Sequence, residues 1–365
     1  MKKSLLALAV LGAYAGVASA QSSVTLYGTV DLNGRYVKND GTEKKLSLGR
    51  DGINSSQLGF RGIEDLGGGL KAGFLLLSSV GADSGDIGAG QSATGSGKFW
   101  TRRSTVSLFS NAGELRLGRD YTPTFWNNTI FDAFGTNGLG DSTHVLQMPS
   151  TTFVRADNSI GYFLPPNIGG FYGQFMAAAA EAGQAGQTSN NGRYLGGRIG
   201  FAAGPFDVAF AYGEQKNVPL FDQKQKTYNL GGSWDFGFLK LLGYLVRDDA
   251  PNLTEDRGSI SAVVPLGQGE IHVGYSRSKL KVDSAPVCVT PIGGGACPGF
   301  DNSIDQWAAT YQYNLSKRTA MYGTISMLNN GDLSRAGVSS GTSIAAAPTA
   351  GGKSKGFELG IRHFF

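Results

Sequence analysis

The sequence predicts an all-β fold, an antiparallel barrel of sixteen strands that spans a membrane. Three observations predict it: segments of alternating polar and apolar residues, connections that alternate between short and long, and a C-terminal strand that ends in Phe365. Alternation with a period of two is typical of strands. Beyond the N-terminus no apolar run reaches the roughly 20 residues of a transmembrane helix, so strands would cross the membrane.

The alternation is clearest near the two ends of the chain. Residues 23–35 place apolar residues or glycine at every even position, and residues 158–164 do so more loosely. In 306–314 one face carries Trp307 and other apolar side chains, and the opposite face is polar. A β-sandwich could alternate in the same way, but arginines recur in mid-strand on the polar face, which a packed sandwich core would not tolerate. In a barrel the apolar face meets lipid and the polar face meets water.

The connections between these segments alternate in length, which fixes the strand number. Short turns are expected at 65–68, 110–113, 165–169, 203–205, around 237, at 266–268 and at 315–318. Longer polar loops are expected at 38–52, 81–98, 120–152, 181–192, 216–226, 249–256, 280–303 and 329–354. Seven turns and eight loops join sixteen strands. An even number returns both ends to the periplasmic side, with the short turns there and the long loops outside.

The first 20 residues predict a cleaved signal peptide. Met1–Lys3 is basic, Ser4–Val17 is an uncharged apolar run of 14 residues, and Ala18-Ser19-Ala20 is a small-residue cleavage pattern. The alternative is a membrane anchor, for which the run is short. Cleavage leaves residues 21–365, where no linker or change of composition marks a second domain. We expect one barrel domain.

Charge and cysteines narrow the class further. Loss of Lys2 and Lys3 lowers the formal net charge from +4 to +2, and no basic block is present, so nucleic acid is not an expected partner. Cys288 and Cys297 are the only cysteines and enclose a segment rich in glycine and proline. In an exported protein this spacing favours one local disulfide. Two free thiols or a metal pair are the alternatives, although no histidine or further cysteine lies nearby.

The last strand is predicted to close the barrel. Phe357, Leu359, Ile361 and Phe365 fall on one face of 356–365. Pairing of this strand with the first strand would remove both sheet edges. An ordinary amphipathic end strand is the alternative interpretation of these ten residues.

An enzymatic function is not expected. His144, His272 and His363 are scattered, and none has metal-ligand spacing with Cys, Asp or Glu. No P-loop spacing is present, and the many glycines belong to turns and strands. We therefore expect no cofactor and no metal, and only His144, in a predicted loop, offers even a remote catalytic candidate.

Five stretches carry a family resemblance: Val24–Gly28, Ser56–Gly67, Leu117–Pro123, Arg155–Ile160 and the terminal Phe365. Together they resemble the Gram-negative general diffusion porins, most closely the group common in betaproteobacteria, from the first strand to the last. The resemblance implies a sixteen-stranded homotrimer in the outer membrane that passes small hydrophilic solutes. It also implies a third loop folded into the barrel, lipopolysaccharide around the outer rim, and recognition of the C-terminal strand by the outer-membrane assembly machinery.

In such porins acidic residues of the third loop face basic residues of the wall. The expected loop, 120–152, offers Asp120, Asp132 and Asp141. The family often has Pro-Glu-Phe-Gly at the loop tip, where this chain has Phe131-Asp132-Ala133-Phe134-Gly135. The resemblance therefore favours Asp132 in the constriction, with a merely solvated loop aspartate as the alternative.

Strand alternation predicts the basic wall. Inward positions are expected for Arg35, Arg61, Arg103, Arg116, Arg155 and Arg198, against three acids, Asp31, Glu114 and Asp157. Arg155 also matches the family's basic ladder. Arg119 matches the ladder too, although alternation from Leu115 and Leu117 directs it toward lipid. A bulge at Gly118 could turn the Arg119 side chain inward. Arg116, which alternation places inward, is the alternative candidate for this position of the ladder.

The basic excess predicts a passive channel with a weak anion preference. Gln57 stands where the family often has arginine, which argues against strong anion binding. A substrate-specific channel for phosphate, organic anions or sugars is the main alternative, with an aromatic slide formed by Tyr121, Phe125, Trp126, Phe131 and Phe134. A barrel without a pore is disfavoured, since sixteen strands leave an aqueous lumen unless it is plugged.

Overall fold

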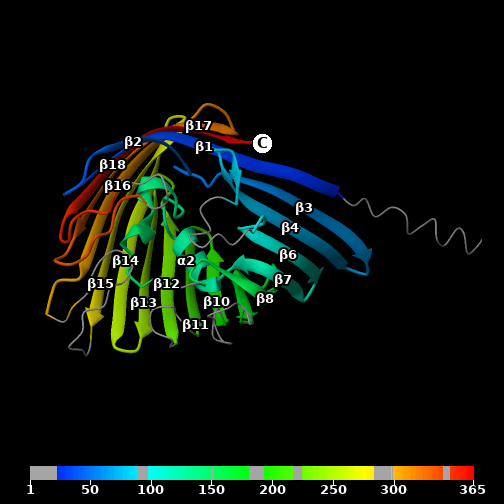
Figure 1. Cartoon of the computed structure of the whole chain (residues 1–365). Helices are drawn as coiled ribbons and strands as arrows, with labels where there is room; N and C mark the ends of the chain where they lie inside the picture. Colours follow the sequence, from blue (N-terminus) through cyan, green and yellow to red (C-terminus); the bar gives the residue numbers. More distant parts are fainter. Residues whose placement is uncertain are drawn as a thin grey trace, which may run out of the picture.

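A single antiparallel sheet closes on itself around a lumen, with one loop folded inside (Figure 1). The computed structural model describes residues 23–88, 98–148, 152–180, 193–216, 224–282, 297, 299–339 and 346–365. Among them, no helix has the length and hydropathy to cross a membrane. Three short helices occur in the described residues, all within the loop that follows β7.

The strands follow the chain in order around the barrel. Their bounds are β1 Ser23–Asn39, β2 Lys45–Arg50, β3 Gln57–Gly67, β4 Leu70–Gly81, β5 Asp86–Ile87, β6 Arg103–Ser110, β7 Gly113–Tyr121, β8 Arg155–Phe163, β9 Phe171–Ala178, β10 Tyr194–Ala203, β11 Phe206–Gln215, β12 Gln225–Asp235, β13 Lys240–Ala250, β14 Leu253–Leu266, β15 Gly269–Val282, β16 Ser303–Asn314, β17 Thr319–Asn330 and β18 Lys353–Phe364. The helices are α2 Pro123–Ile130 and the 3₁₀ turns η1 Gly138–Gly140 and η2 Ser142–Val145.

Eighteen strand segments make sixteen wall strands. β2 and β3 both pair with β1, at 32–37 and 23–29, and are two parts of one wall strand interrupted at 51–56. β5 has two residues, pairs only with the end of β4 and belongs to the following loop. The predicted sixteen-stranded antiparallel barrel is therefore confirmed.

The first and last strands close the barrel. β1 pairs with β18 from Thr29 with Phe364 to Asn39 with Ser354. At the end of the chain, Phe365 and Gly28 exchange two backbone hydrogen bonds of 3.1 and 3.2 Å. Closure leaves no edge strand whose amide groups would face hydrocarbon.

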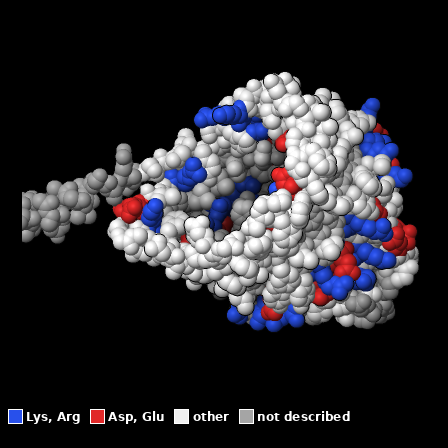
Figure 2. Space-filling model, turned by 180° about the vertical axis from the view of Figure 1, so that it is seen from behind, with Lys and Arg blue, Asp and Glu red and all other residues white. Residues whose placement is uncertain are grey.

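The predicted alternation is also confirmed. Trp307 is 56% exposed on the outer surface, whereas the neighbouring Gln306 is 2% exposed and faces the interior. On β1 the outward Val24 and Leu26 are exposed, and the inward Asp31 is buried. Figure 2 shows a broad outer surface with few charges, while charged side chains gather at one side of the barrel and within its opening. This distribution matches lipid outside and water inside.

Two predicted loops are shorter than expected. The segment 249–256 is predicted as a loop because it is polar, but only Pro251 and Asn252 separate β13 from β14. Its charged side chains are accommodated by pairing, since Arg247 lies opposite Asp256 and their side chains form an ion pair of 2.7 Å. The loop expected at 38–52 is likewise reduced to 40–44, because β2 resumes the pairing with β1.

The closure predicts different effects for two glycines on the outer face of β1. A Cβ atom at Gly28 would lie 2.3 Å from the Phe365 ring and 2.6 Å from the Gln57 carbonyl oxygen, whereas a Cβ at Gly34 meets nothing within 4 Å. Overpacking costs about 1–3 kcal/mol, so we expect Gly28→Val to lower the temperature at which the folded band is lost in heat-modifiability electrophoresis. Gly34→Val is the matched control. Equal melting of the two variants would contradict this account of closure.

Candidate functional site

The loop between β7 and β8, residues 122–154, folds into the lumen, as the resemblance implied for 120–152 (Figure 1). Its first helix, α2, lies against β10, β11 and β12. α2 begins at Pro123 because proline presets the helical φ angle, and the Thr122 hydroxyl accepts a hydrogen bond from the Phe125 N–H at 3.4 Å. The loop thus turns inward directly at the end of β7.

Aromatic side chains fix the loop to wall positions that lack a side chain. Phe131 is fully buried against Gly231, where an added Cβ would lie 2.2 Å from the ring. Phe134 packs over Gly274, where the corresponding distance is 2.7 Å. Since close packing leaves no room for a larger residue at either glycine, the wall determines where the loop sits.

Hydrogen bonds anchor the backbone of the same loop. The Ala133 N–H donates to the Ser261 hydroxyl at 3.0 Å, and the Ala133 carbonyl lies 2.6 Å from Nδ1 of His272. Further along, the Glu255 carboxylate accepts the N–H groups of residues 147–148 at 3.0 and 2.7 Å. These contacts hold both halves of the loop against the wall and leave space on its other side.

That space is a cavity of about 1180 Å³ between the loop and the wall. Residues 135–138 and Asp141 line it from the loop, and Arg35, Arg103 and Arg155 line it from the wall. Basic side chains are visible inside the opening in Figure 2. The cavity is the narrowed part of the lumen, and we call it the constriction.

The interruption between β2 and β3 forms a second part of the constriction. At 51–56 the backbone leaves the wall and is held by Asp31, whose carboxylate accepts the N–H groups of residues 52–54 at 2.8 to 3.1 Å. Ser55 then donates to the Asn137 side chain of the loop at 2.7 Å. Wall and loop are therefore joined at the constriction.

Three arginines surround one phenol on the wall, and we call this group the Tyr121 cluster. Arg102 and Arg155 each donate to the Tyr121 hydroxyl, at 2.9 and 3.0 Å. The Arg103 guanidinium lies 5.9 Å from the centre of the Tyr121 ring and forms an ion pair of 2.7 Å with Asp120. The cluster concentrates positive charge at one side of the constriction.

Arg35 also lines the constriction, but a carboxylate accompanies it. Its guanidinium lies 2.8 Å from Glu358 and donates to the Ser339 hydroxyl at 3.1 Å. The Glu358 carboxylate in turn accepts the Leu139 N–H of the loop at 3.4 Å. Arg35 thus joins three parts of the chain, and its charge is largely compensated.

Three other predicted arginines lie on inward positions of the wall without lining the constriction. Arg61 stacks on the Tyr27 ring at 5.4 Å, toward the periplasmic end of β3. Arg116 is paired with Asp120 at 2.6 Å. Arg198 is buried beneath α2, where it donates to Asn127 of that helix. None of the three lines the cavity, so a direct role in the constriction stays a prediction for them.

Arg119 occupies an outward position, so its predicted place in the constriction is wrong. The pairing of β6 with β7 runs unbroken through Arg119, which lies opposite Ser104 and follows the exposed Leu117 on the same face. The irregularity at Gly118 falls in the pairing with β8 and does not turn the side chain inward. Arg119 instead forms an ion pair of 2.7 Å with Asp157, which had also been expected to face inward.

Asp120 belongs to the wall rather than to the loop. It is the eighth of the nine residues of β7, is almost fully buried, and is shared by Arg103 and Arg116. The prediction that Asp120 is an acidic residue of the constriction loop is wrong, because the loop begins two residues later than expected.

Asp132 is a structural residue of the loop. Its carboxylate accepts the N–H groups of Phe134 and Thr136, both at 3.1 Å, and the Ser142 hydroxyl at 2.9 Å. Burial raises the pKa of Asp132 to about 6, although these hydrogen bonds favour the ionised form. It does not line the constriction. The predicted role of Asp132 in the constriction therefore stays a prediction, and its carboxylate is directed to the loop's own backbone.

Asp141 is the predicted acid that does line the constriction. One carboxylate oxygen caps η2 by accepting the Thr143 N–H at 2.7 Å. His144 lies beside it, and burial lowers the pKa of His144. Asp141 therefore places negative charge on the loop side of a cavity whose wall is basic.

Comparisons with known proteins agree with this architecture. Residues 7–333 match the family model described as Gram-negative porin. The chain is 38% identical to outer membrane porin protein 32 of Delftia acidovorans, over the full length of both, and 31% identical to an outer membrane porin of Bordetella pertussis, covering 90% of this chain and 95% of that one. The solved anion-selective porin from Comamonas acidovorans superposes with a TM-score of 0.79 at 34% identity, covering 94% of this chain and 100% of that one.

The chain belongs to the Gram-negative porin family. It is an outer-membrane β-barrel channel through which small hydrophilic solutes and ions diffuse passively. The predicted family and location are thereby confirmed.

Several charged residues of the porin's constriction were not predicted. Arg50, Asp51, Asp83 and Asp86 line it, yet they fall in segments expected as external loops. Arg102 precedes β6, and its backbone N–H donates to the Leu77 carbonyl at 3.0 Å. In the pairing of β4 with β6, however, Leu77 lies opposite Arg103, so Arg102 stands just outside the regular pairing. The adjacent arginines at 102–103 were the only sequence signal, and strict alternation directed just one of them inward.

Other predicted features lie at the margin of the described residues. Cys297 is buried and disulfide-bonded, whereas Cys288 lies outside the described residues, so their pairing stays a prediction. The signal peptide, residues 1–20, lies outside them as well. Phe365 occupies the closure position expected for it.

The contrast between two loop aspartates gives a test. Removing one charge about 10 Å from a passing ion changes its energy by about 0.4 kcal/mol in water, roughly a twofold change in relative permeability. We expect Asp141→Asn to shift the reversal potential in a KCl gradient toward anion selectivity, by an amount that corresponds to this roughly twofold change in relative permeability. Asp132→Asn is the control and should leave ion selectivity nearly unchanged while weakening the loop. A larger selectivity shift for Asp132→Asn would contradict the assignment.

Proposed function

We propose that the porin is a general diffusion channel with a weak preference for anions, set by the Tyr121 cluster. The observation that carries the proposal is the convergence of Arg102, Arg103 and Arg155 on Tyr121 at the constriction. Charges that line the narrowest part of a pore act on every passing ion. Because the cluster lies on the wall and Asp141 on the loop, the field is directed across the pore.

The preference should be weak because acids nearly match bases. The charged side chains that line the constriction among the described residues are five arginines and four aspartates, namely Arg35, Arg50, Arg102, Arg103, Arg155, Asp51, Asp83, Asp86 and Asp141. Arg35 is further compensated by Glu358, and Arg103 by Asp120. The resemblance to the anion-selective Comamonas porin supports the sign of the preference.

Arg102 provides the test of this sign. Arg102→Gln removes one positive charge from the cluster and retains a donor for Tyr121, so we expect the reversal potential to shift toward cations, by roughly twofold in permeability ratio. Arg247→Gln is the matched control, because Arg247 is exposed on the outer surface and paired with Asp256. A cation preference of the unmodified porin would overturn the proposal.

A substrate-specific anion or sugar channel is the second candidate. Tyr121, Phe125 and Trp126 line the constriction beside the arginines, as a binding site for a particular solute would require. Tyr121 stacks on Phe125, with ring centres 5.6 Å apart, which favours packing of the loop start over solute binding.

Liposome swelling separates the two candidates. For a general channel we expect the rates for a series of sugars and organic acids to fall steeply with size and to depend little on chemistry. Rates that saturate with one solute, or one solute that exceeds smaller ones, would favour the specific channel instead.

We further propose that the porin assembles as a homotrimer through the outer surface of β6 to β9. These strands have only eight or nine residues each, so the barrel wall is shortest there. The outward Arg119 pairs there with Asp157, which also contacts Lys98 at 2.5 Å. Charged groups on a lipid-facing surface are costly, and a second copy would cover them. Conductance steps in groups of three in planar bilayers would report the trimer.

Export and assembly complete the proposal. The signal peptide would be removed before Gln21, the assembly machinery would recognise the strand that ends in Phe365, and lipopolysaccharide would surround the outer rim. N-terminal sequencing of the porin purified from outer membranes tests the cleavage, since any start other than Gln21 would contradict it.

A further inference from the structure

The Tyr121 hydroxyl accepts hydrogen bonds from two positive charges that repel each other. Arg102 and Arg155 donate to this one oxygen at 2.9 and 3.0 Å. Arg155 also lies over the Tyr121 ring, 4.5 Å from its centre. Two guanidinium groups on one acceptor lie close together, where like charges disfavour each other. The acceptor is therefore what keeps the two arginines side by side.

This hydroxyl differs from the other acceptors of arginine at the constriction because a phenol carries no formal charge at neutral pH. Arg35 is bound by the Glu358 carboxylate at 2.8 Å, and Arg103 by the Asp120 carboxylate at 2.7 Å. Each of those ion pairs fixes an arginine and also compensates its charge. The Tyr121 hydroxyl fixes arginines and leaves their charge available to a passing ion.

The position of Arg102 depends on this hydroxyl. Across the part of the chain that the structure describes, the Arg102 guanidinium makes this one hydrogen bond, and its buried Nε has no partner. Asp51, another residue that lines the constriction, is near enough to interact with Arg102 electrostatically. Without the hydroxyl, the Arg102 side chain is free to turn to that carboxylate, which would compensate its charge.

The start of the loop holds the Tyr121 ring in place. The ring stacks on Phe125, with the ring planes 13° apart and the centres 5.6 Å apart, and it meets the edge of Trp126 at 5.2 Å. Phe125 in turn contacts Phe153 at the end of the loop, with the ring centres 5.8 Å apart. These contacts involve the ring alone, so a phenylalanine would keep the packing and lose only the acceptor.

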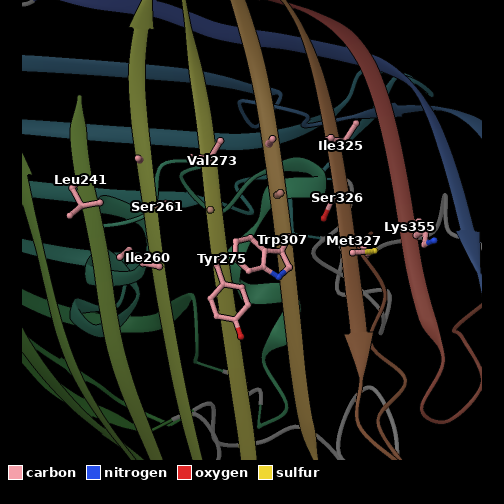
Figure 3. Close-up of a pocket in the computed structure, with 14 residues that line it drawn as sticks. Leu241, Ile260, Ser261, Val273, Tyr275, Trp307, Ile325, Ser326, Met327 and Lys355 are labelled. Carbon is pink, nitrogen blue, oxygen red and sulfur yellow. The ribbon is translucent and has the colours of Figure 1, made fainter. Parts of the chain in front are cut away.

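A second tyrosine beside an arginine has the opposite arrangement. Tyr275 lies on the outer face of β15, next to Trp307 (Figure 3). Its hydroxyl donates to the Asp305 carboxylate, which also lies 3.5 Å from the Arg277 guanidinium. Here a carboxylate compensates the arginine, so the hydroxyl of Tyr275 holds no uncompensated charge.

We propose that Tyr121 is a positioning residue of the channel, whose hydroxyl holds Arg102 and Arg155 together at the constriction without neutralising them. The inference rests on the proposed anion preference and assigns it to a neutral acceptor as well as to the arginines. Arginines and aspartates that line the constriction nearly balance in number. The sign of the selectivity therefore depends on where two arginines are held.

Tyr121→Phe tests the proposal, because it keeps the ring and removes the acceptor. We expect the ratio of chloride to potassium permeability, measured from the reversal potential of the purified porin in a KCl gradient, to fall by roughly twofold. Tyr275→Phe is the matched control and should leave the ratio unchanged, because it removes a hydroxyl beside an arginine outside the lumen.

Tyr194→Phe controls for loosening of the loop. The Tyr194 hydroxyl is buried 3.3 Å from the Thr124 hydroxyl of α2 and does not line the constriction. We expect this variant to lower the temperature at which the folded band is lost in heat-modifiability electrophoresis and to keep the permeability ratio. A fall in the ratio as large as that of Tyr121→Phe would mean that loop packing, and not the acceptor, sets the selectivity.

Comparison with a porin that lacks both arginines separates positioning from packing. In a porin that already carries Arg102→Gln and Arg155→Gln, we expect Tyr121→Phe to cause no further change in the permeability ratio. A further fall of the same size in that background would overturn the inference, since the hydroxyl would then act independently of the arginines.

The remaining outcomes are also decisive. Heat-modifiable migration shows whether each variant is folded, and Tyr121→Leu, which also removes the acceptor, replaces Tyr121→Phe if that variant does not fold. An unchanged ratio in Tyr121→Phe would overturn the inference, and so would a rise, which would show that the phenol acts as a negative charge. The proposed anion preference fails separately, if the unmodified porin prefers cations, and a twofold fall in Tyr121→Phe would still support the positioning role.

Discussion

The closure of β1 on β18 is the constraint on which the rest of the structure depends. A sheet in hydrocarbon must satisfy every backbone amide within itself, and only a closed sheet does so. Eleven paired positions join the two strands from Thr29 to Asn39, and the chain end adds the pair of hydrogen bonds between Phe365 and Gly28. Once the sheet is closed, side-chain direction follows from strand position, so one alternating pattern produces both an outer surface for lipid and an inner surface for water.

The closed wall then determines where the third loop lies. Glycines at Gly231 and Gly274 leave room for Phe131 and Phe134, and Glu255 and His272 bind the loop backbone. With one side of the loop fixed in this way, its other side and the wall enclose the constriction. The channel properties therefore arise from packing on the far side of the loop as much as from the charges that solutes meet.

The sequence predicted the barrel better than the site, for reasons that particular residues make clear. Residues 23–35 and 306–314 alternate because each side chain experiences one environment, and that local pattern is visible in the sequence. Asp132 and Asp141, in contrast, have the same chemistry and the same loop, and only the folded loop turns one inward to its own backbone and the other to the pore. Arg119 was predicted to face the lumen because the family resemblance was given more weight than strand alternation. The observed pairing of Arg119 with Ser104 agrees with the alternation, which directs the side chain outward.

By itself the sequence determined the fold class, the strand number and the face on which most residues lie, because these follow from short-range alternation and from the lengths of connections. Tertiary structure alone decided which charges meet at the constriction. Arg102 and Arg155 converge on Tyr121 from segments more than fifty residues apart, and the break at 51–56 reaches the loop only through the barrel. Such contacts depend on the closure of the sheet and on the packing of the loop, neither of which leaves a local pattern in the chain.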